Sequence, residues 1–146
     1  FAVSRGRKLT VSLRSGPRAR VTKGTATDSG ARGAPPAVPF VTPFETALQE
    51  LPLSPSSYVA IVTRGHSHDE TCLRDALRTE AGYIGMIGSR NKRNAIYAAL
   101  EKEGATAGDL ARVHCPIGLS IGAETPAEIA VSIVAELIAY RAGHLP

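Results

Sequence analysis

The chain has 146 residues, of which 43% are hydrophobic, and a formal net charge of +4. This length suits one globular domain with its own core, and no apolar run approaches the roughly 20 residues of a membrane-spanning helix. No apolar segment follows the basic N-terminus, so no secretory signal is indicated and a cytoplasmic location is the default expectation. Cys72 and Cys115 lie too far apart to suggest a disulfide framework or a zinc site.

The charge is unevenly distributed along the chain. Residues 1–38 hold eight Lys or Arg residues and one Asp, whereas residues 39–146 hold nine Lys or Arg residues and twelve acidic ones. We therefore divide the chain into a basic, Gly/Ser/Pro-rich segment at 1–38 and a folded domain at 39–146. Because the domain is mildly acidic and no aromatic residue is interleaved in the basic segment, nucleic acid is not expected as the main partner.

In the basic segment, residues 9–13 alternate like a strand, and residues 18–22 are the expected hairpin partner after a turn at 15–17. Residues 24–39 show little that could pack. The following residues predict a short helix at 43–51, where Thr42 precedes a proline and an acidic first turn.

From residue 58 the chain alternates between apolar runs and helical patterns. We predict an inner parallel strand at 58–63, a helix at 69–79, a strand at 83–87, a helix at 91–103 and a helical turn at 107–111. An extended or looped segment at 114–121 leads to a long helix that starts with a capping box at Thr125–Glu128 and ends near residue 142.

The apolar face of this last helix is expected to include Ile129, Ile133, Leu137 and Tyr140, broadened by Val134 and Ile138. The alternation of strands and helices predicts an α/β fold with a parallel sheet and flanking helices. In such sheets, ligands bind at the carboxyl ends of the strands.

A basic helix start follows the second strand. Ser89 is a good N-cap, yet Arg90, Lys92 and Arg93 place cations where the helix is already partly positive. An anion between them would resolve this, and Gly85 and Gly88 would let the backbone approach it, so the pattern predicts a phosphate site. The alternative is a solvated basic turn whose glycines serve packing.

His66, His68 and Asp69 follow the first strand of the domain. They could ligate a metal, act as acid or base groups, or hold a phosphate, and Asp69 could instead be a simple N-cap. No third strong ligand is near in sequence, so we predict no metal site. The glycine-punctuated loop at 115–126 is either a tight connection or a pocket wall with Glu124 facing the ligand.

No catalytic residue is assigned, because Cys115 lacks an evident orienting group. The dinucleotide fingerprint Gly-x-Gly-x-x-Gly is also absent, which leaves NAD(P) binding without sequence support.

The phrases at 63–69, 83–90, 116–119 and 121–133 closely resemble the C-terminal Rossmann-like domain of the XdhC/CoxI family, over about residues 40–142. These proteins are accessory factors for molybdenum hydroxylases such as xanthine dehydrogenase and carbon monoxide dehydrogenase. The resemblance implies a Rossmann-like fold that binds molybdenum cofactor (molybdopterin) and helps insert it into an apo-hydroxylase, with a sulfur donor as a further partner. The expected contacts with the cofactor are Gly85, Gly88, Ser89, Arg90, Lys92, Arg93, His66, His68, Asp69 and Glu124.

The sequence departs from the family before Phe40, where the usual first strand and glycine-rich turn are missing, so the first β-unit is atypical. Two alternatives stay open. One is an NAD(P)-dependent oxidoreductase domain on the same fold. The other is a non-catalytic module that forms a homodimer through an exposed sheet edge.

Overall fold

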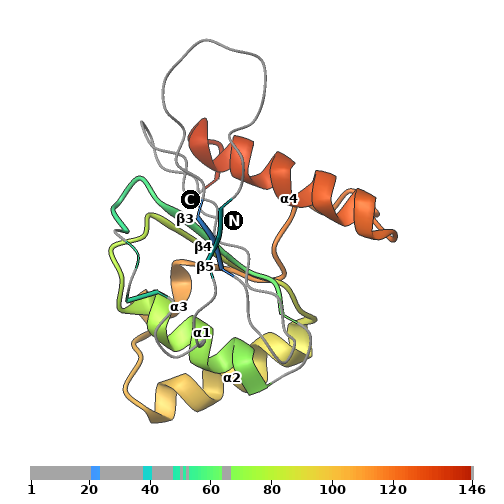
Figure 1. The fold of residues 1–146 in the computed structure, drawn as a ribbon. Helices are drawn as coiled ribbons and strands as arrows, with labels where there is room; N and C mark the ends of the chain where they lie inside the picture. The colour runs from blue at the N-terminus through green and yellow to red at the C-terminus, as the bar shows by residue number, and fades with distance from the viewer. Residues whose placement is uncertain are drawn as a thin grey trace.

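The computed structural model describes residues 21–23, 38–40, 48–49, 51, 53–63 and 67–145. The centre of the fold is a three-stranded parallel sheet in the order β3-β4-β5, formed by β3 (Tyr58–Ile61), β4 (Tyr83–Met86) and β5 (Val113–His114). The helices α1 (Ser67–Leu77), α2 (Arg90–Lys102) and α3 (Ala107–Ala111) lie on one side of this sheet, and α4 (Pro126–Arg141) lies on the other (Figure 1). The predicted α/β fold with flanking helices is confirmed.

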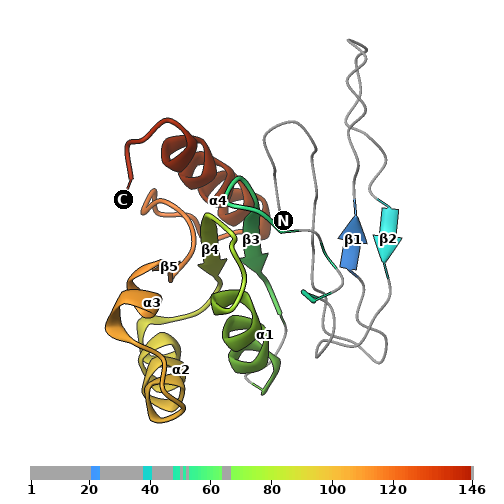
Figure 2. The same cartoon turned by 90° about the vertical axis from the view of Figure 1, so that its left-hand side faces the viewer.

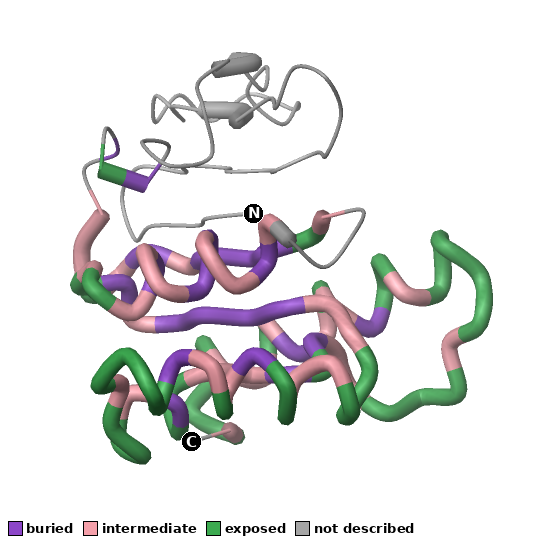
Figure 3. Tube along the Cα trace, turned by 90° about the horizontal axis from the view of Figure 1, so that it is seen from below, coloured by how far each residue is buried: buried purple, intermediate pink, exposed green. Residues whose placement is uncertain are grey.

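The register of the sheet places Tyr58 beside Tyr83 and Gly85 beside His114. All four residues of β4 are buried, as expected for a central strand with helices on both faces (Figure 3). The prediction that 58–63 is an inner strand is not borne out in the described part of the chain, because β3 pairs on one side only, with β4. The strand also ends at Ile61, and Val62 is already exposed.

The two faces of the sheet carry different cores because strand side chains alternate between faces. Val59, Ile61, Ile84 and Met86 belong to the larger apolar cluster. Leu73 and Ala76 of α1 and Ile96 and Leu100 of α2 complete it from the helices. On the opposite face, where α4 lies (Figure 2), a smaller cluster is made by Ala60, Tyr83 and Ile117, with Ile133, Leu137 and Tyr140 packed against it.

The helix starts follow the predicted capping residues. Ser89 caps α2, and Thr125 with Glu128 forms the capping box of α4. α1 begins two residues earlier than predicted, at Ser67, so that Asp69 lies in the first turn of the helix and is not its N-cap. Gly104 follows α2 with a φ of +99°, a left-handed conformation that glycine adopts readily.

The predicted inner face of α4 is partly wrong. Val134 and Ile138 are 47% and 51% exposed, whereas Ser132 and Glu136 are buried. The two polar residues are accommodated because each forms hydrogen bonds with the chain beneath α4. The Ser132 hydroxyl donates to the Leu119 carbonyl, and the Glu136 carboxylate accepts from the Tyr83 hydroxyl and the Gly118 amide.

Part of the sequence before residue 53 is also described. Strand β1 (Val21–Lys23) pairs antiparallel with β2 (Val38–Phe40), so the expectation that residues 24–39 lack packed structure fails at Val38 and Pro39. The predicted strand 9–13, and with it the predicted hairpin to 18–22, lies outside the described residues. So does most of the predicted helix 43–51, of which residues 48 and 49 form a turn. Among the described residues, no helix is both long and apolar enough to cross a lipid bilayer.

We expect Gly85→Ala to destabilise the domain. An added Cβ would lie 2.8 Å from both Ile117 Cγ1 and the Tyr83 hydroxyl, inside a filled core. Overpacking of this kind costs about 1–3 kcal/mol. Gly108→Ala is the matched control, because its Cβ would meet nothing closer than 3.6 Å and alanine favours the helical conformation of α3. Urea unfolding of both variants tests this, and equal stability would contradict the packing described.

Candidate functional site at the start of helix α2

The predicted phosphate site lies where β4 leads into α2. The Ile87 amide continues the sheet by donating to the Ile61 carbonyl at 2.9 Å, and the chain then turns through Gly88 into the helix. The Ser89 hydroxyl accepts from the Lys92 amide at 3.2 Å, and the Ser89 carbonyl accepts from the Arg93 amide. The amides of Arg90 and Asn91 keep no hydrogen-bond partner in the described part of the chain, as is usual for the first turn of a helix.

The three cations at this helix start have different surroundings. Arg90 is exposed and has no ion-pair partner among the described residues. Lys92 folds back to form an ion pair with Asp69, and only 12% of its side chain is exposed. Arg93 donates to the Cys115 carbonyl at 3.2 Å, and its guanidinium lies 5.9 Å from the centre of the Tyr97 ring. Arg90 is therefore the cation whose charge is most available to a ligand.

Asp69 is fully buried and connects three elements. Its carboxylate accepts from the Thr63 hydroxyl after β3 and pairs with Lys92 of α2, while Asp69 itself belongs to α1. The structure thus brings two of the predicted site residues, Asp69 and Lys92, into contact with each other. His68 is half-buried beside Asp69, and His66 lies outside the described residues.

The predicted glycines also have internal neighbours. Gly85 lies inside β4 beneath Ile117, and the aliphatic part of Lys92 covers Gly88, where an added Cβ would lie 2.9 Å from Lys92 Cδ. Glu124 is exposed at the entrance to α4, and its amide donates to the Glu128 carboxylate. Neither Gly85 nor Glu124 is brought close to Arg90 by any contact in the described part of the chain.

Hydrogen bonds of three consecutive backbone amides hold the loop before α4 in place. The Ile117 amide donates to the Met86 carbonyl at 3.0 Å, the Gly118 amide to Glu136 at 2.9 Å, and the Leu119 amide to the Ser132 carbonyl at 3.2 Å. Gly118 has a φ of +106°, and a side chain there would overlap the Ser132 hydroxyl. The glycine at this position is therefore required by a tight connection, one of the two interpretations of the loop.

A buried polar cluster on the α4 side of the sheet was not predicted from the sequence. Glu136 accepts from the Tyr83 hydroxyl, and His114 Nδ1 lies 3.9 Å from the same carboxylate oxygen. The His114 ring stacks on Tyr83 at 4.6 Å, and Tyr140 meets both rings edge-on. The signal that could have revealed the cluster is Glu136 itself, an acid spaced three and four residues from Ile133 and Tyr140 on the inner face.

Burial and the hydrogen bond to Glu136 raise the pKa of Tyr83 far above its usual value, so the phenol stays protonated and acts as a donor. Burial lowers the pKa of His114, and the neighbouring Glu136 carboxylate opposes part of that change. The Glu136 carboxylate accepts hydrogen bonds from within the fold, from the Tyr83 hydroxyl and the Gly118 amide, which suits a structural role better than contact with a ligand.

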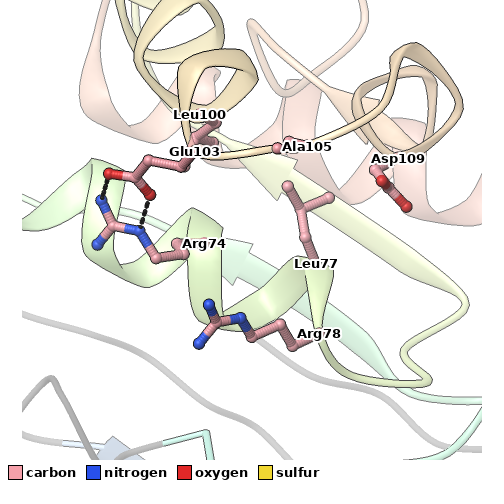
Figure 4. Close-up of a pocket in the computed structure, with 8 residues that line it drawn as sticks. Arg74, Leu77, Arg78, Leu100, Glu103, Ala105 and Asp109 are labelled. Carbon is pink, nitrogen blue, oxygen red and sulfur yellow. Dashed lines mark hydrogen bonds and ion pairs between the residues drawn. The ribbon is translucent and has the colours of Figure 1, made fainter.

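One open hollow, of about 340 Å³, lies elsewhere, between the C-terminal parts of α1 and α2 and the start of α3 (Figure 4). Arg74, one of the two arginines that line it, already forms hydrogen bonds with Glu103 at 2.5 and 2.8 Å and with Glu70 at 2.7 Å. The helices there have run back from the carboxyl ends of the strands, so this hollow is separate from the predicted site. No group of three or more potential metal ligands occurs among the residues described.

Comparison with known proteins identifies the family. The family model described as the XdhC Rossmann domain matches residues 9–137, which is most of the chain. The chain belongs to this family. The match includes residues 9–38, so it extends further towards the N-terminus than the resemblance seen at 40–142.

The chain is also similar to individual proteins. The chain is 34% identical over 67% of its length to the Escherichia coli protein named "Uncharacterized protein YqeB", and 33% identical over 73% to a Bacillus subtilis protein named as a probable xanthine dehydrogenase subunit. It also resembles a crystal structure described as a xanthine dehydrogenase from Bacillus halodurans, with a TM-score of 0.60 and 30% identity over 73% of the chain. The matched region spans 18%, 31% and 30% of these proteins, respectively.

We predict that the Asp69–Lys92 pair stabilises the junction between β3, α1 and α2. Lys92→Met keeps the aliphatic stem over Gly88 but leaves a fully buried carboxylate without its cation, and losses of about 3–5 kcal/mol are typical when one member of a buried pair is removed. The double variant Lys92→Met/Asp69→Asn should recover part of this loss. Urea unfolding of the single and double variants measures the coupling.

Arg74→Met is the matched control, since it breaks the more exposed Arg74–Glu103 pair and should cost less. Additive effects of the Asp69 and Lys92 substitutions would show that their interaction contributes nothing.

The lowered pKa of His114 predicts a loss of stability in mild acid. The unfolded chain binds a proton near the ordinary histidine pKa of about 6.5, whereas the folded chain binds it only at lower pH. The contribution of neutral His114 to the free energy of unfolding is therefore fully present above the pKa of the unfolded chain. It is lost as the pH falls towards the pKa of the folded chain. His114→Phe keeps a ring on Tyr83 and should lose less stability than the wild type between pH 7.5 and 5.5. Equal losses in urea unfolding would rule out this contribution.

Proposed function

We propose that this domain binds the phosphate-bearing end of molybdenum cofactor and acts in the maturation of hydroxylases of the xanthine dehydrogenase type. Membership of the XdhC family and the names of two relatives support the connection with xanthine dehydrogenase. An apo-hydroxylase is then the partner that receives the cofactor, and a sulfur donor acts on the bound cofactor. When bound, the cofactor supplies the redox chemistry of the hydroxylase, so the task of the domain is to bind and orient it.

The observation that carries the proposal is the first turn of α2. The amides of Arg90 and Asn91, which have no hydrogen-bond partner among the described residues, lie at the positive end of a 13-residue helix, and the Arg90 side chain in the same turn is exposed. Phosphate oxygens accept hydrogen bonds from both kinds of donor, so the residues fit this part of the cofactor. The pairing of Lys92 with Asp69 removes one cation from the predicted set, and the contacts of Arg93 hold that side chain half-buried beside the Cys115 carbonyl.

In this proposal Ser89 shapes the turn by capping the Lys92 amide, while Arg90 and the adjacent amides contact the phosphate. We assign His68, which is half-buried next to Asp69 in the first turn of α1, as the histidine that borders a larger ligand in this proposal. No observation on the described residues favours NAD(P) over another phosphate compound, because the dinucleotide fingerprint is absent.

Arg90→Ala should weaken binding of molybdenum cofactor released from a purified hydroxylase by about tenfold, the effect of losing one charge-assisted contact partly screened by water. Arg141→Ala is the matched control, because it removes an exposed arginine from the last turn of α4. The fold should be unchanged in both variants, since neither side chain has a partner among the described residues. Equilibrium dialysis with pterin fluorescence after oxidation measures the affinity.

Inorganic pyrophosphate and NADH serve as comparison ligands in the same experiment. Competition by pyrophosphate, dependent on Arg90, would support the phosphate contact. Binding of NADH without binding of the molybdenum cofactor would favour the oxidoreductase alternative. Equal affinity of the wild type and Arg90→Ala for the cofactor would refute the assignment of this site.

A further inference from the structure

Helix α4 carries a second apolar face that points away from the sheet. Val131, Val134 and Ile138 are 61%, 47% and 51% exposed, although they belong to a helix whose other face packs on Tyr83 and Ile117. Together with Ala127 they recur at intervals of four, three and four residues, which places them on one stripe. We call these four residues the outer stripe. Because Ile133, Leu137 and Tyr140 pack against the sheet from the other side of α4, the outer stripe faces away from the strands.

The apolar character of the outer stripe does not result from a lack of polar residues in α4. α4 contains Ser132 and Glu136, and both are turned inward to meet donors and acceptors beneath the helix. Because these polar groups face inward, the outward stripe consists of aliphatic residues only. Clustered exposed aliphatic side chains are typical of a surface that another protein surface covers.

We propose that the outer stripe pairs antiparallel with the outer stripe of a second copy of this chain. The spacing is self-complementary. If two α4 helices run antiparallel about a two-fold axis between positions 134 and 135, Val131 of one copy faces Ile138 of the other, and the two copies of Val134 meet near the axis. Ala130 and Ala135 flank the stripe and allow the helices to approach closely.

The charges at the two ends of α4 favour the same arrangement. The start of the helix is acidic, with Glu124 and Glu128 exposed, and its last turn carries the exposed Arg141. An antiparallel pair brings the acidic end of each helix to the level of the basic end of its partner, and it also opposes the two helix dipoles. A parallel pair would place like charges at the same level, so electrostatics selects the antiparallel form.

The size of the stripe predicts a weak dimer. A helix of 16 residues is ~24 Å long, and one face of it offers less than the ~800 Å² per partner that stable complexes bury. Association should therefore be reversible and depend on protein concentration. This inference does not rest on the proposed ligand, because the outer stripe and the first turn of α2 are on opposite sides of the sheet.

Sedimentation equilibrium of the full chain over a wide concentration range tests the pairing. The wild type should shift from monomer to dimer as concentration rises, and Val134→Glu should remain monomeric because two carboxylates would meet near the axis. Ala98→Glu adds the same charge on an exposed position of α2 and should dimerise like the wild type. A monomer at every concentration, or dimerisation of Val134→Glu equal to that of the wild type, would overturn the proposal.

Oxidative cross-linking tests the orientation. Two copies of Val134→Cys would be offset by only ~1.5 Å along the helix axis and should form a disulfide, whereas two copies of Val131→Cys would be offset by ~10 Å and should not. The double variant Val131→Cys/Ile138→Cys should cross-link, because position 131 of each copy faces position 138 of the other. The native Cys72 and Cys115 are buried and add little background. Efficient cross-linking of Val131→Cys alone would indicate a parallel pair and refute the antiparallel one.

Discussion

The buried carboxylate of Asp69 is the contact on which the candidate site depends. It joins the end of β3, the first turn of α1 and the first turn of α2, through Thr63 and Lys92. A buried carboxylate needs both a cation and hydrogen-bond donors, and here these come from the two segments that border the carboxyl ends of β3 and β4. The positions of both helix starts are therefore set by an internal interaction, whether or not a ligand is bound.

This interaction also separates the roles of the basic residues. A cluster of three cations in sequence becomes one internal cation, one cation held against a carbonyl and an aromatic ring, and one exposed cation. Glu136 has a comparable function on the other face of the sheet, where it connects β4, the loop before α4 and α4 itself. Two buried acids thus fix the helices on opposite faces of the same central strand.

The order and type of the elements could be predicted because local signals dominate there. Ser89, Thr125 and Glu128 mark helix starts, and the apolar runs at 58–61 and 83–86 mark buried strands. The partners of Asp69 and Glu136 could not be predicted, since residues far apart in sequence supply them. The inward side of α4 was predicted in part: Ile133, Leu137 and Tyr140 pack against the sheet as expected. Val134 and Ile138 were wrongly included, because the apolar residues of α4 form two stripes and periodicity alone does not distinguish them. The pairing of β1 with β2 joins segments separated by a stretch without a strand pattern.

The position of the Lys92 stem over Gly88 has a consequence for variation at this turn. Any side chain at position 88 would compete with Lys92 for the same space, since a Cβ there lies 2.9 Å from Lys92 Cδ. Displacing Lys92 would deprive Asp69 of its cation and at the same time release a positive charge towards the solvent. Substitutions at this one position would therefore lower the folding stability of the domain and at the same time increase its attraction for anions.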